Sequence, residues 1–419
     1  MTSSDKRELH LDFISASDIC SSIFDGTHDS PKQQVSGFKL VTSRHIKNNM
    51  VLKDEAYFIT EEDYLKINKR SGLKVGDVLF TMIGTVGEVC RITSEPDFAI
   101  KNIGVFRPKE IKDSVWIYYY LISPEGRKNV ESSKRGTTQQ FMGLKELREF
   151  PIIFPRDTLY RQNQSQILEL LDSKISVNNA LSKTLEDIAQ TIFRSWFIDF
   201  DPVKAKMNGE KPIGMDDETA ALFPDSFAES ELGLIPKGWK TINLSDIAYI
   251  FQGKYVKPSE LNLTRNVDFP TPVEGATKSI GFTNKSTFQF DYPTVSCRGS
   301  CGYVRWISSP AWISNNLMAI YSKEQELYNY YLYFLMKTIN FENITTGSVQ
   351  GQITIRNLAP TKLIYQPEIV KTFSELVEPF QKTIMKLEYQ SKLYADVRDS
   401  LLPRLISGEL EIPEEMLAS

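Results

Sequence analysis

Residues 80–89 read FTMIGTVGEV, and residues 295–304 read VSCRGSCGYV. In both stretches, strand-like residues stand on each side of a Gly-x-x-Gly turn, first at Gly84 and Gly87 and then at Gly299 and Gly302. The chain therefore carries one unit twice, at a spacing of roughly 210–230 residues, and such an internal repeat constrains the fold more than any local motif does.

The match continues outward from the turn in the same order. The segment GTTQQFMGLKEL at 136–147 corresponds to GSVQGQITIRNL at 347–358. An apolar strand that ends in proline closes each copy, at 150–155 and at 362–367. Two copies of one plan predict two domains with the same fold.

A long helical pattern follows each closing strand, with apolar residues about 3.5 positions apart. A helix of about 35 residues is on the order of 50 Å long, and neither helix can bury such a stripe alone. We therefore expect the two helices to pack antiparallel. The stripes consist of Ile167, Leu171, Ile175, Leu181, Leu185, Ile188 and Ile192 in the first helix, and of Phe373, Val377, Phe380, Ile384, Leu387, Tyr394 and Leu401 in the second.

The predicted fold class is α+β, with two globular domains related by an internal repeat and separated by two long antiparallel, coiled-coil-like helices. The expected ranges are a first domain at 1–156, a helix at 157–200, a linker at 201–235, a second domain at 236–367, a helix at 368–411 and a tail at 412–419. The linker mixes Gly, Pro and acidic residues, which predicts a surface segment with one short helix near 218–222.

Composition excludes several classes of protein. The chain has 419 residues, of which 41% are hydrophobic and 24% charged, so it is long and apolar enough to build folded domains. Its net charge of −4 gives no global attraction to nucleic acid, so any such contact must come from local patches. No apolar stretch is long enough to span a membrane, no signal peptide is present, and the four cysteines are too few for a disulfide framework. We therefore expect a cytoplasmic protein.

Catalytic motifs are absent from the sequence. There is no Gly-x-Gly-x-x-Gly after a strand, no Walker loop, no Gly-x-Ser-x-Gly elbow and no His-Glu-x-x-His, which favours a binding protein over an enzyme. The pair Cys297 and Cys301 could be half of a zinc site. Their counterparts in the first copy are the apolar Met82 and Val86, which favours buried cysteines instead.

Both copies carry a polar loop rich in Ser, Thr and Gln beside a cation, at 132–140 and at 345–352. These side chains can hydrogen-bond to phosphates and base edges, and the glycine turns can bring backbone amides close to a phosphate. A solvated linker and a tight hairpin are the alternatives, and the duplication favours a functional loop. The candidate nucleic-acid contacts are Lys134, Arg135, Thr137, Thr138, Gln139 and Gln140 in the first copy, and Arg298, Ser300, Ser348, Gln350, Gln352 and Arg356 in the second.

Two further features each leave an alternative open. An apolar run at the end of the first helix either packs into the core or docks a partner, as do its counterparts in the second helix; its members are Phe193, Trp196, Phe197 and Phe200, with Leu401, Leu402 and Leu405. The segment Asp25-Gly26-Thr27-His28 is either a structural turn or holds a catalytic Asp and His.

With these segments in view, the chain resembles the specificity subunit of type I restriction-modification systems over nearly its full length. The most specific segments are TIFRSWFIDFDPV at 191–203 and SLLPRLISGEL at 400–410. IPKGW at 235–239, the segment from Asp25 to His28 and the two Gln-containing loops support the resemblance.

The resemblance implies two target-recognition domains that read a split sequence in double-stranded DNA, with the helices acting as a spacer. It also implies docking of two modification subunits, which use S-adenosylmethionine to methylate adenine, and of restriction/translocase subunits that use ATP and Mg. These cofactors would belong to the partners, with none in this chain. A stand-alone metal-dependent nuclease using Asp25 and His28, and a scaffold without DNA contact, are the alternative functions.

Overall fold

The computed structural model describes residues 11–136, 140–346 and 351–412. The chain divides into two compact units, Met1–Val177 with Ser391–Ser419 (unit 1) and Asn178–Gln390 (unit 2). Each long helix contributes one half to each unit. Within the described residues, no helix combines the length and the apolar character needed to cross a membrane.

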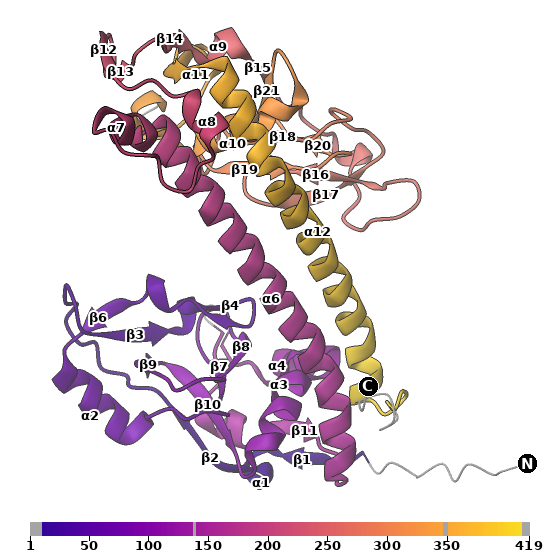
Figure 1. Ribbon diagram of the computed structural model, residues 1–419. Helices are drawn as coiled ribbons and strands as arrows, with labels where there is room; N and C mark the ends of the chain where they lie inside the picture. The colour runs from indigo at the N-terminus through magenta and orange to yellow at the C-terminus, as the bar shows by residue number, and fades with distance from the viewer. Residues whose placement is uncertain (1–10, 137–139, 347–350, 413–419) are drawn as a thin grey trace, which may run out of the picture. The chain divides into compact units, whose positions relative to one another are not determined.

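Unit 1 is built around a four-stranded antiparallel sheet in the order β2-β10-β7-β8 (Figure 1). Its strands are β1 (Phe13–Ser15), β2 (Cys20–Asp25), β3 (Phe38–Thr42), β4 (Ile46–Lys47), β5 (Met50–Val51), β6 (Tyr57–Ile59), β7 (Val78–Thr81), β8 (Val89–Arg91), β9 (Phe98–Lys101), β10 (Ile103–Pro108) and β11 (Pro151–Ile153). Its helices are α1 (Ala16–Ile19), α2 (Glu61–Ser71), α3 (Ser114–Ile122), α4 (Pro124–Ser133), α5 (Leu144–Arg148) and the first half of α6 (Thr158–Phe197), with short 3-10 turns at Ser43–His45, Lys53–Glu55 and Ile111–Asp113.

The core of unit 1 lies between this sheet and α3. All four residues of β7 are buried, which is why that strand reads as a continuous rather than an alternating apolar run. Trp116, Tyr119 and Tyr120 of α3 are buried as well, in the same hydrophobic cluster as Phe80 of β7. A smaller sheet, β6-β3-β9, pairs β3 with β9 in parallel and packs against α2.

Unit 2 repeats this topology with different residues. The order β15-β21-β18-β19 reproduces the four-stranded antiparallel sheet, and β17-β16-β20 reproduces the small sheet with its parallel pair, β16 and β20. Its strands are β12 (Phe227–Ser230), β13 (Gly233–Pro236), β14 (Lys240–Asn243), β15 (Ala248–Gln252), β16 (Thr271–Glu274), β17 (Ser279–Thr283), β18 (Tyr292–Ser296), β19 (Val304–Ile307), β20 (Trp312–Ile313), β21 (Leu317–Ser322) and β22 (Lys362–Tyr365). Its helices are α7 (Asp201–Met207), α8 (Asp217–Ala221), α9 (Leu244–Ile247), α10 (Asn329–Thr338), α11 (Ile355–Leu358) and the first half of α12 (Pro367–Ile406), with 3-10 turns at Pro258–Glu260, Glu326–Tyr328 and Phe341–Ile344.

The duplicated architecture confirms the α+β class predicted from the repeat. In both units the strand before the long helix pairs antiparallel with the first strand of the domain: β1 with β11 and β14 with β22. An aromatic-rich helix follows the same strand and 3-10 turn in each unit: α3 follows β10, and α10 follows β21. The repeat in the sequence is therefore a repeat of tertiary structure.

The helices run antiparallel within each unit. In unit 1, the Tyr160 hydroxyl of α6 donates to the Leu405 carbonyl of α12 at 3.1 Å, and Asp172 pairs with Arg398 at 2.5 Å. In unit 2, the Asn178 amide donates to the Leu387 carbonyl at 3.4 Å, and the rings of Phe193 and Phe373 lie 5.4 Å apart. In each unit a later residue of α6 contacts an earlier residue of α12, as the predicted packing requires.

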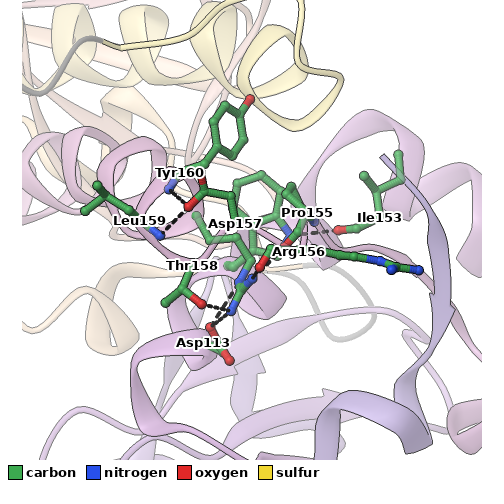
Figure 2. Close-up of polar contacts among 10 residues, drawn as sticks. Asp113, Ile153, Pro155, Arg156, Asp157, Thr158, Leu159 and Tyr160 are labelled. Atoms are coloured by element: carbon green, nitrogen blue, oxygen red, sulfur yellow. Dashed lines mark hydrogen bonds and ion pairs between the residues drawn. The ribbon is translucent and has the colours of Figure 1, made fainter. Parts of the chain in front are cut away.

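The start of α6 is anchored in unit 1 by a buried ion pair. Arg161, which is 5% exposed, donates to Asp113 Oδ1 from Nε at 3.1 Å and from Nη2 at 2.8 Å. The carbonyls of Pro155 and Arg156 and the Thr158 hydroxyl accept its remaining hydrogen bonds (Figure 2). All three nitrogens of this guanidinium therefore donate hydrogen bonds. A charged side chain that would be costly to bury alone is thus fully paired.

The segment 201–235 is more ordered than its composition predicts. It contains two helices, α7 and α8, and the hairpin β12–β13 rather than one short helix. Val203 and Phe223 are buried, and the Phe223 ring packs 5.4 Å from that of Trp196. These apolar residues tie the segment to the core of unit 2. Most of its other residues are exposed, and α8 lies where the one short helix was expected, so the additions to the expectation are α7 and the hairpin.

Candidate nucleic-acid interface

The two glycine turns have the same hydrogen bonds. In unit 1 the Thr81 hydroxyl accepts from the Glu88 amide at 2.9 Å and donates to the Thr85 carbonyl. In unit 2 the Ser296 hydroxyl accepts from the Tyr303 amide at 2.9 Å and donates to the Ser300 carbonyl. A side-chain hydroxyl at the end of the buried strand therefore closes each turn, which leaves the turn in one defined shape.

The two glycines of each turn have different surroundings. A Cβ atom on Gly84 or Gly299 would meet nothing within 4 Å. A Cβ on Gly87 would lie 3.0 Å from Val130, and one on Gly302 would lie 2.7 Å from Phe341. The first glycine of each turn thus faces open space, while the second packs against its own domain.

Each polar loop begins and ends beside the glycine turn. In unit 1, Phe141 forms β-bridges with Ile83 of the turn and with Arg135 at the start of the loop. In unit 2, Gln352 forms the same two bridges with Arg298 and Thr346. Two segments that the sequence separates by about 50 residues therefore form one surface, and they do so in the same way in both units. We name this surface, comprising turn, loop ends and the short helix that follows (α5 or α11), the turn–loop interface.

The predicted contact residues divide into those that the structure places and those that lie outside it. Thr137, Thr138, Gln139, Ser348 and Gln350 fall outside the described residues. Of the seven described residues, two are half-buried, Lys134 and Gln352. The other five are exposed: Arg135, Gln140, Arg298, Ser300 and Arg356. All seven belong to the turn–loop interface or its immediate flank.

The two predicted cations of unit 1 are already paired with carboxylates. Lys134 forms an ion pair with Glu131, and Arg135 Nη2 lies 2.5 Å from Glu146 Oε1. The second oxygen of Glu146 accepts from the Gly143 amide at 2.9 Å, which caps α5. In unit 2 the corresponding positions hold Thr346 and Asn357, whose side chains lie 3.5 Å apart. The same contact is thus charged in one unit and neutral in the other.

Sequence reasoning missed Lys145. This residue is exposed on α5, and its counterpart on α11 is Arg356, which was a predicted contact. Both lie two residues after the N-cap residue of their helix, which is Gly143 in α5 and Thr354 in α11. The repeat alignment itself could have identified Lys145, because it places a cation at this position in both copies.

The difference between the two glycines gives a direct test of the turn. We expect Gly302→Ala to destabilise unit 2 by about 1–3 kcal/mol more than Gly299→Ala. Both positions have a positive φ, but only Gly302 packs against a neighbouring side chain, that of Phe341. Hydrogen exchange of unit 2 peptides at increasing urea concentration would measure both free energies. Equal losses for the two variants would contradict this description of the turn.

Asp25 and His28 form a local polar cluster. His28 Nε2 lies 3.0 Å from Asp25 Oδ2, and its Nδ1 lies 2.8 Å from Asn102 Oδ1. Arg70 donates to the Gly26 carbonyl at 2.8 Å. Among the described residues, no group of three or more His, Cys, Asp or Glu side chains is placed to hold a metal ion. The cluster closes the end of β2 through these local hydrogen bonds, which agrees with the structural-turn interpretation.

The apolar run, for which the sequence left a core and a docking interpretation open, lies in the core. Phe193, Trp196, Phe197 and Phe200 belong to the hydrophobic cluster of unit 2, and Leu402 and Leu405 belong to that of unit 1, with Leu401 packed against it. Side chains buried by their own chain cannot present a surface to a partner. The core interpretation is therefore the correct one for these residues.

Cys297 is buried directly after β18, and burial raises the pKa of its thiol. Cys301 is half-buried in the turn, and its thiol donates to the Gly351 carbonyl at 3.0 Å. The Cys301 thiol thus packs between the turn and the end of the loop, whereas the Cys297 thiol accepts from the Gln252 amide at 3.3 Å in the interior of unit 2, as small polarisable side chains do.

A family model described as "Type I restriction modification DNA specificity domain" matches residues 12–189 and 236–389, one region for each copy of the repeat. The chain is 26% identical to the Type I restriction enzyme HindI specificity subunit of Haemophilus influenzae, over 60% of this chain and 68% of that protein. It is 23% identical to the Type I restriction enzyme MjaIX specificity subunit of Methanocaldococcus jannaschii, over 81% of this chain and 78% of that protein. Among solved structures, its fold is similar to that of the S subunit of a type I restriction-modification system from M. genitalium, with a TM-score of 0.60, 15% identity and coverage of 96% of this chain and 97% of that one.

Proposed function

The chain belongs to the type I restriction modification DNA specificity family, and from this membership we propose that its two recognition domains each read one half of a split DNA target through the turn–loop interface. Members of this family are non-catalytic recognition subunits. The target is double-stranded DNA, whose phosphates position the protein and whose base edges supply specificity.

One observation carries the proposal. The same surface, built from a closed glycine turn and the two ends of a polar loop, occurs once in each unit and with the same backbone bridges. The residues on it differ between the units: Arg298 and Gln352 in unit 2 stand where Ile83 and Phe141 stand in unit 1. A constant scaffold with variable side chains suits two domains that read two different sequences.

The proposal extends to the partners. We place the subunit in the cytoplasm, in a complex with two modification subunits that methylate adenine and with restriction/translocase subunits. S-adenosylmethionine, ATP and Mg would be bound by those partners. The net charge of −4 supports a complex of this kind. A chain with a negative net charge attracts DNA phosphates weakly, so the partners would supply much of that attraction.

The test is to co-express the chain with a candidate modification subunit and to map methylated adenines across the genome by long-read sequencing. We expect a motif with two defined halves and a fixed, unspecified gap. A stable complex that methylates no such motif would overturn the recognition proposal in favour of a scaffold without DNA contact.

A paired substitution tests whether each domain reads one half. We expect the double variant Gln139→Ala with Gln140→Ala to weaken recognition of one half of the motif only, because these residues belong to the polar loop of the first domain. The same methylation map measures this effect. An equal loss of specificity in both halves would contradict the assignment of one domain to one half.

A further inference from the structure

We propose that Arg298 reads a guanine in the half-site bound by the second recognition domain, with Gln352 holding its guanidinium in place. This inference rests on the proposed function and adds to it a specific residue and a specific base.

The backbone of both residues is fixed. Arg298 follows β18, whose five residues are all buried, with only Cys297 between them. The Ile353 amide donates to the Cys297 carbonyl at 3.0 Å. The Gln352 amide donates to the Thr346 carbonyl at 2.8 Å, and the Thr346 amide donates back to the Gln352 carbonyl at 2.9 Å. Arg298 and Gln352 are therefore held side by side before any DNA binds, which lowers the entropy lost on binding.

The side chains leave one edge of the guanidinium free. With its amide oxygen facing Arg298, the orientation that its donors and acceptors favour, Gln352 accepts from Nε at 3.3 Å and from Nη2 at 3.2 Å. These bonds occupy the edge shared by Nε and Nη2. The outer edge, formed by Nη1 and the second hydrogen of Nη2, stays available for a ligand, because the Arg298 side chain is exposed. No carboxylate in the described part of the chain forms an ion pair with Arg298.

A free guanidinium edge of this kind matches the O6 and N7 acceptors of guanine in the major groove, which is the commonest specific contact between arginine and a base. A phosphate could take the same edge. The comparison of the units favours the base, since phosphates surround both half-sites alike, whereas unit 1 holds Ile83 and Phe141 at these positions. Phe141 is 42% exposed and cannot donate a hydrogen bond from its ring. A contact present in one domain and absent from the other is expected for reading sequence.

The experiment uses the complex with the modification subunit. The wild-type methylation map identifies the motif, and we expect one half to contain a guanine that becomes degenerate in the Arg298→Ala and Arg298→Lys variants while the other half stays unchanged. Lysine keeps the charge but loses the two-pronged donor, so it separates base reading from simple attraction to phosphate. Lys371→Ala removes an exposed charge of the same unit outside the interface and should leave the motif unchanged.

A change in the DNA tests the same contact without any risk that a protein variant misfolds. Replacing that guanine by 7-deazaguanine deletes the N7 acceptor, and we expect the wild-type complex to lose about 5-fold or more in affinity. Arg298→Lys, which preserves the charge, should lose no more than about 2-fold from the same replacement. Gln352→Ala should weaken the guanine preference without abolishing it, because the charge stays but the orientation is lost.

The outcomes separate the two proposals. Absence of a split motif in the wild-type map would defeat the proposed function itself. A split motif that both Arg298 variants retain, with binding reduced equally at all sequences or not at all, would leave the proposed function standing and overturn the assignment of Arg298 to a base. A motif without guanine in either half would overturn that assignment as well.

Discussion

Replacing Arg161 by Met should lower the free energy of unfolding of unit 1 by about 3–5 kcal/mol. The variant leaves the Asp113 carboxylate without its partner. Asp113 is only 6% exposed, so this charge stays buried. It also removes the donors that Pro155, Arg156 and Thr158 share in the wild type (Figure 2). The expected loss comes mainly from the unpaired charge rather than from lost attraction, since the pair itself is costly to bury.

The measurement must report on unit 1 separately, because unfolding of a chain with two units is not a two-state process. Hydrogen exchange of unit 1 peptides at increasing urea concentration provides this. Arg156→Met is the matched control: its side chain is 80% exposed and lies 3.4 Å from Asp12, so its loss should change the stability by no more than about 0.5 kcal/mol. A loss of similar size in both variants would show that the burial of Arg161 is not what matters.

A double variant separates the charge from the packing. The buried positions of α6 at 161, 165 and 168 match those of α12 at 370, 374 and 377, so Val370 is the counterpart of Arg161. Tyr328, at the end of the 3-10 turn before α10, is likewise the counterpart of Asp113. Unit 2 thus forms this junction from uncharged residues, Val370 and Tyr328. We expect Arg161→Met combined with Asp113→Leu to recover about half of the loss.

The repeat made much of the architecture predictable. The turns at Gly84 and Gly299 occupy the same position in the two copies, so a single alignment located both domains and both long helices. The helices expected at 157–200 and 368–411 run Thr158–Phe197 and Pro367–Ile406. Pro379 stands inside the second predicted helix, yet α12 continues through it. That position is exposed, so water can satisfy the carbonyl that the missing amide leaves free.

The pairings within the site were less predictable. The sequence singled out the turns and the loops separately, and nothing in it indicates that Phe141 bridges to Ile83 or that Gln352 bridges to Arg298. The partners of Lys134 and Arg135 were equally hidden, although both carboxylates lie within eleven residues of them in the sequence. Such contacts depend on how side chains are directed after the backbone has folded, which spacing along an irregular loop does not determine.

Burial of the apolar run was also left open by the sequence. An aromatic side chain every three or four positions at a helix end is equally consistent with a core and with a docking surface. What decides between them is the presence of a second layer. Here that layer comes from α10 and α12, whose Tyr331, Phe334 and Phe373 rings lie 5.6, 6.3 and 5.4 Å from the Phe193 ring.

Replacing Phe193 by Ala should therefore lower the free energy of unfolding of unit 2 by about 3–5 kcal/mol, because it leaves a cavity among these rings and that of Phe197. Hydrogen exchange of unit 2 peptides in urea measures the loss. Ile188→Ala, on the same helix and 43% exposed, is the control and should cost about 1 kcal/mol or less.

The same variant distinguishes the core from the docking interpretation. At a temperature where unit 2 remains folded, Phe193→Ala should bind the modification subunit with wild-type affinity, because the ring contributes no area to the surface. Pull-down titration alongside hydrogen exchange gives both readouts on one sample. A loss of partner affinity with unchanged exchange in unit 2 would restore the docking interpretation, since only a side chain that the partner contacts directly could reduce binding without first loosening the core.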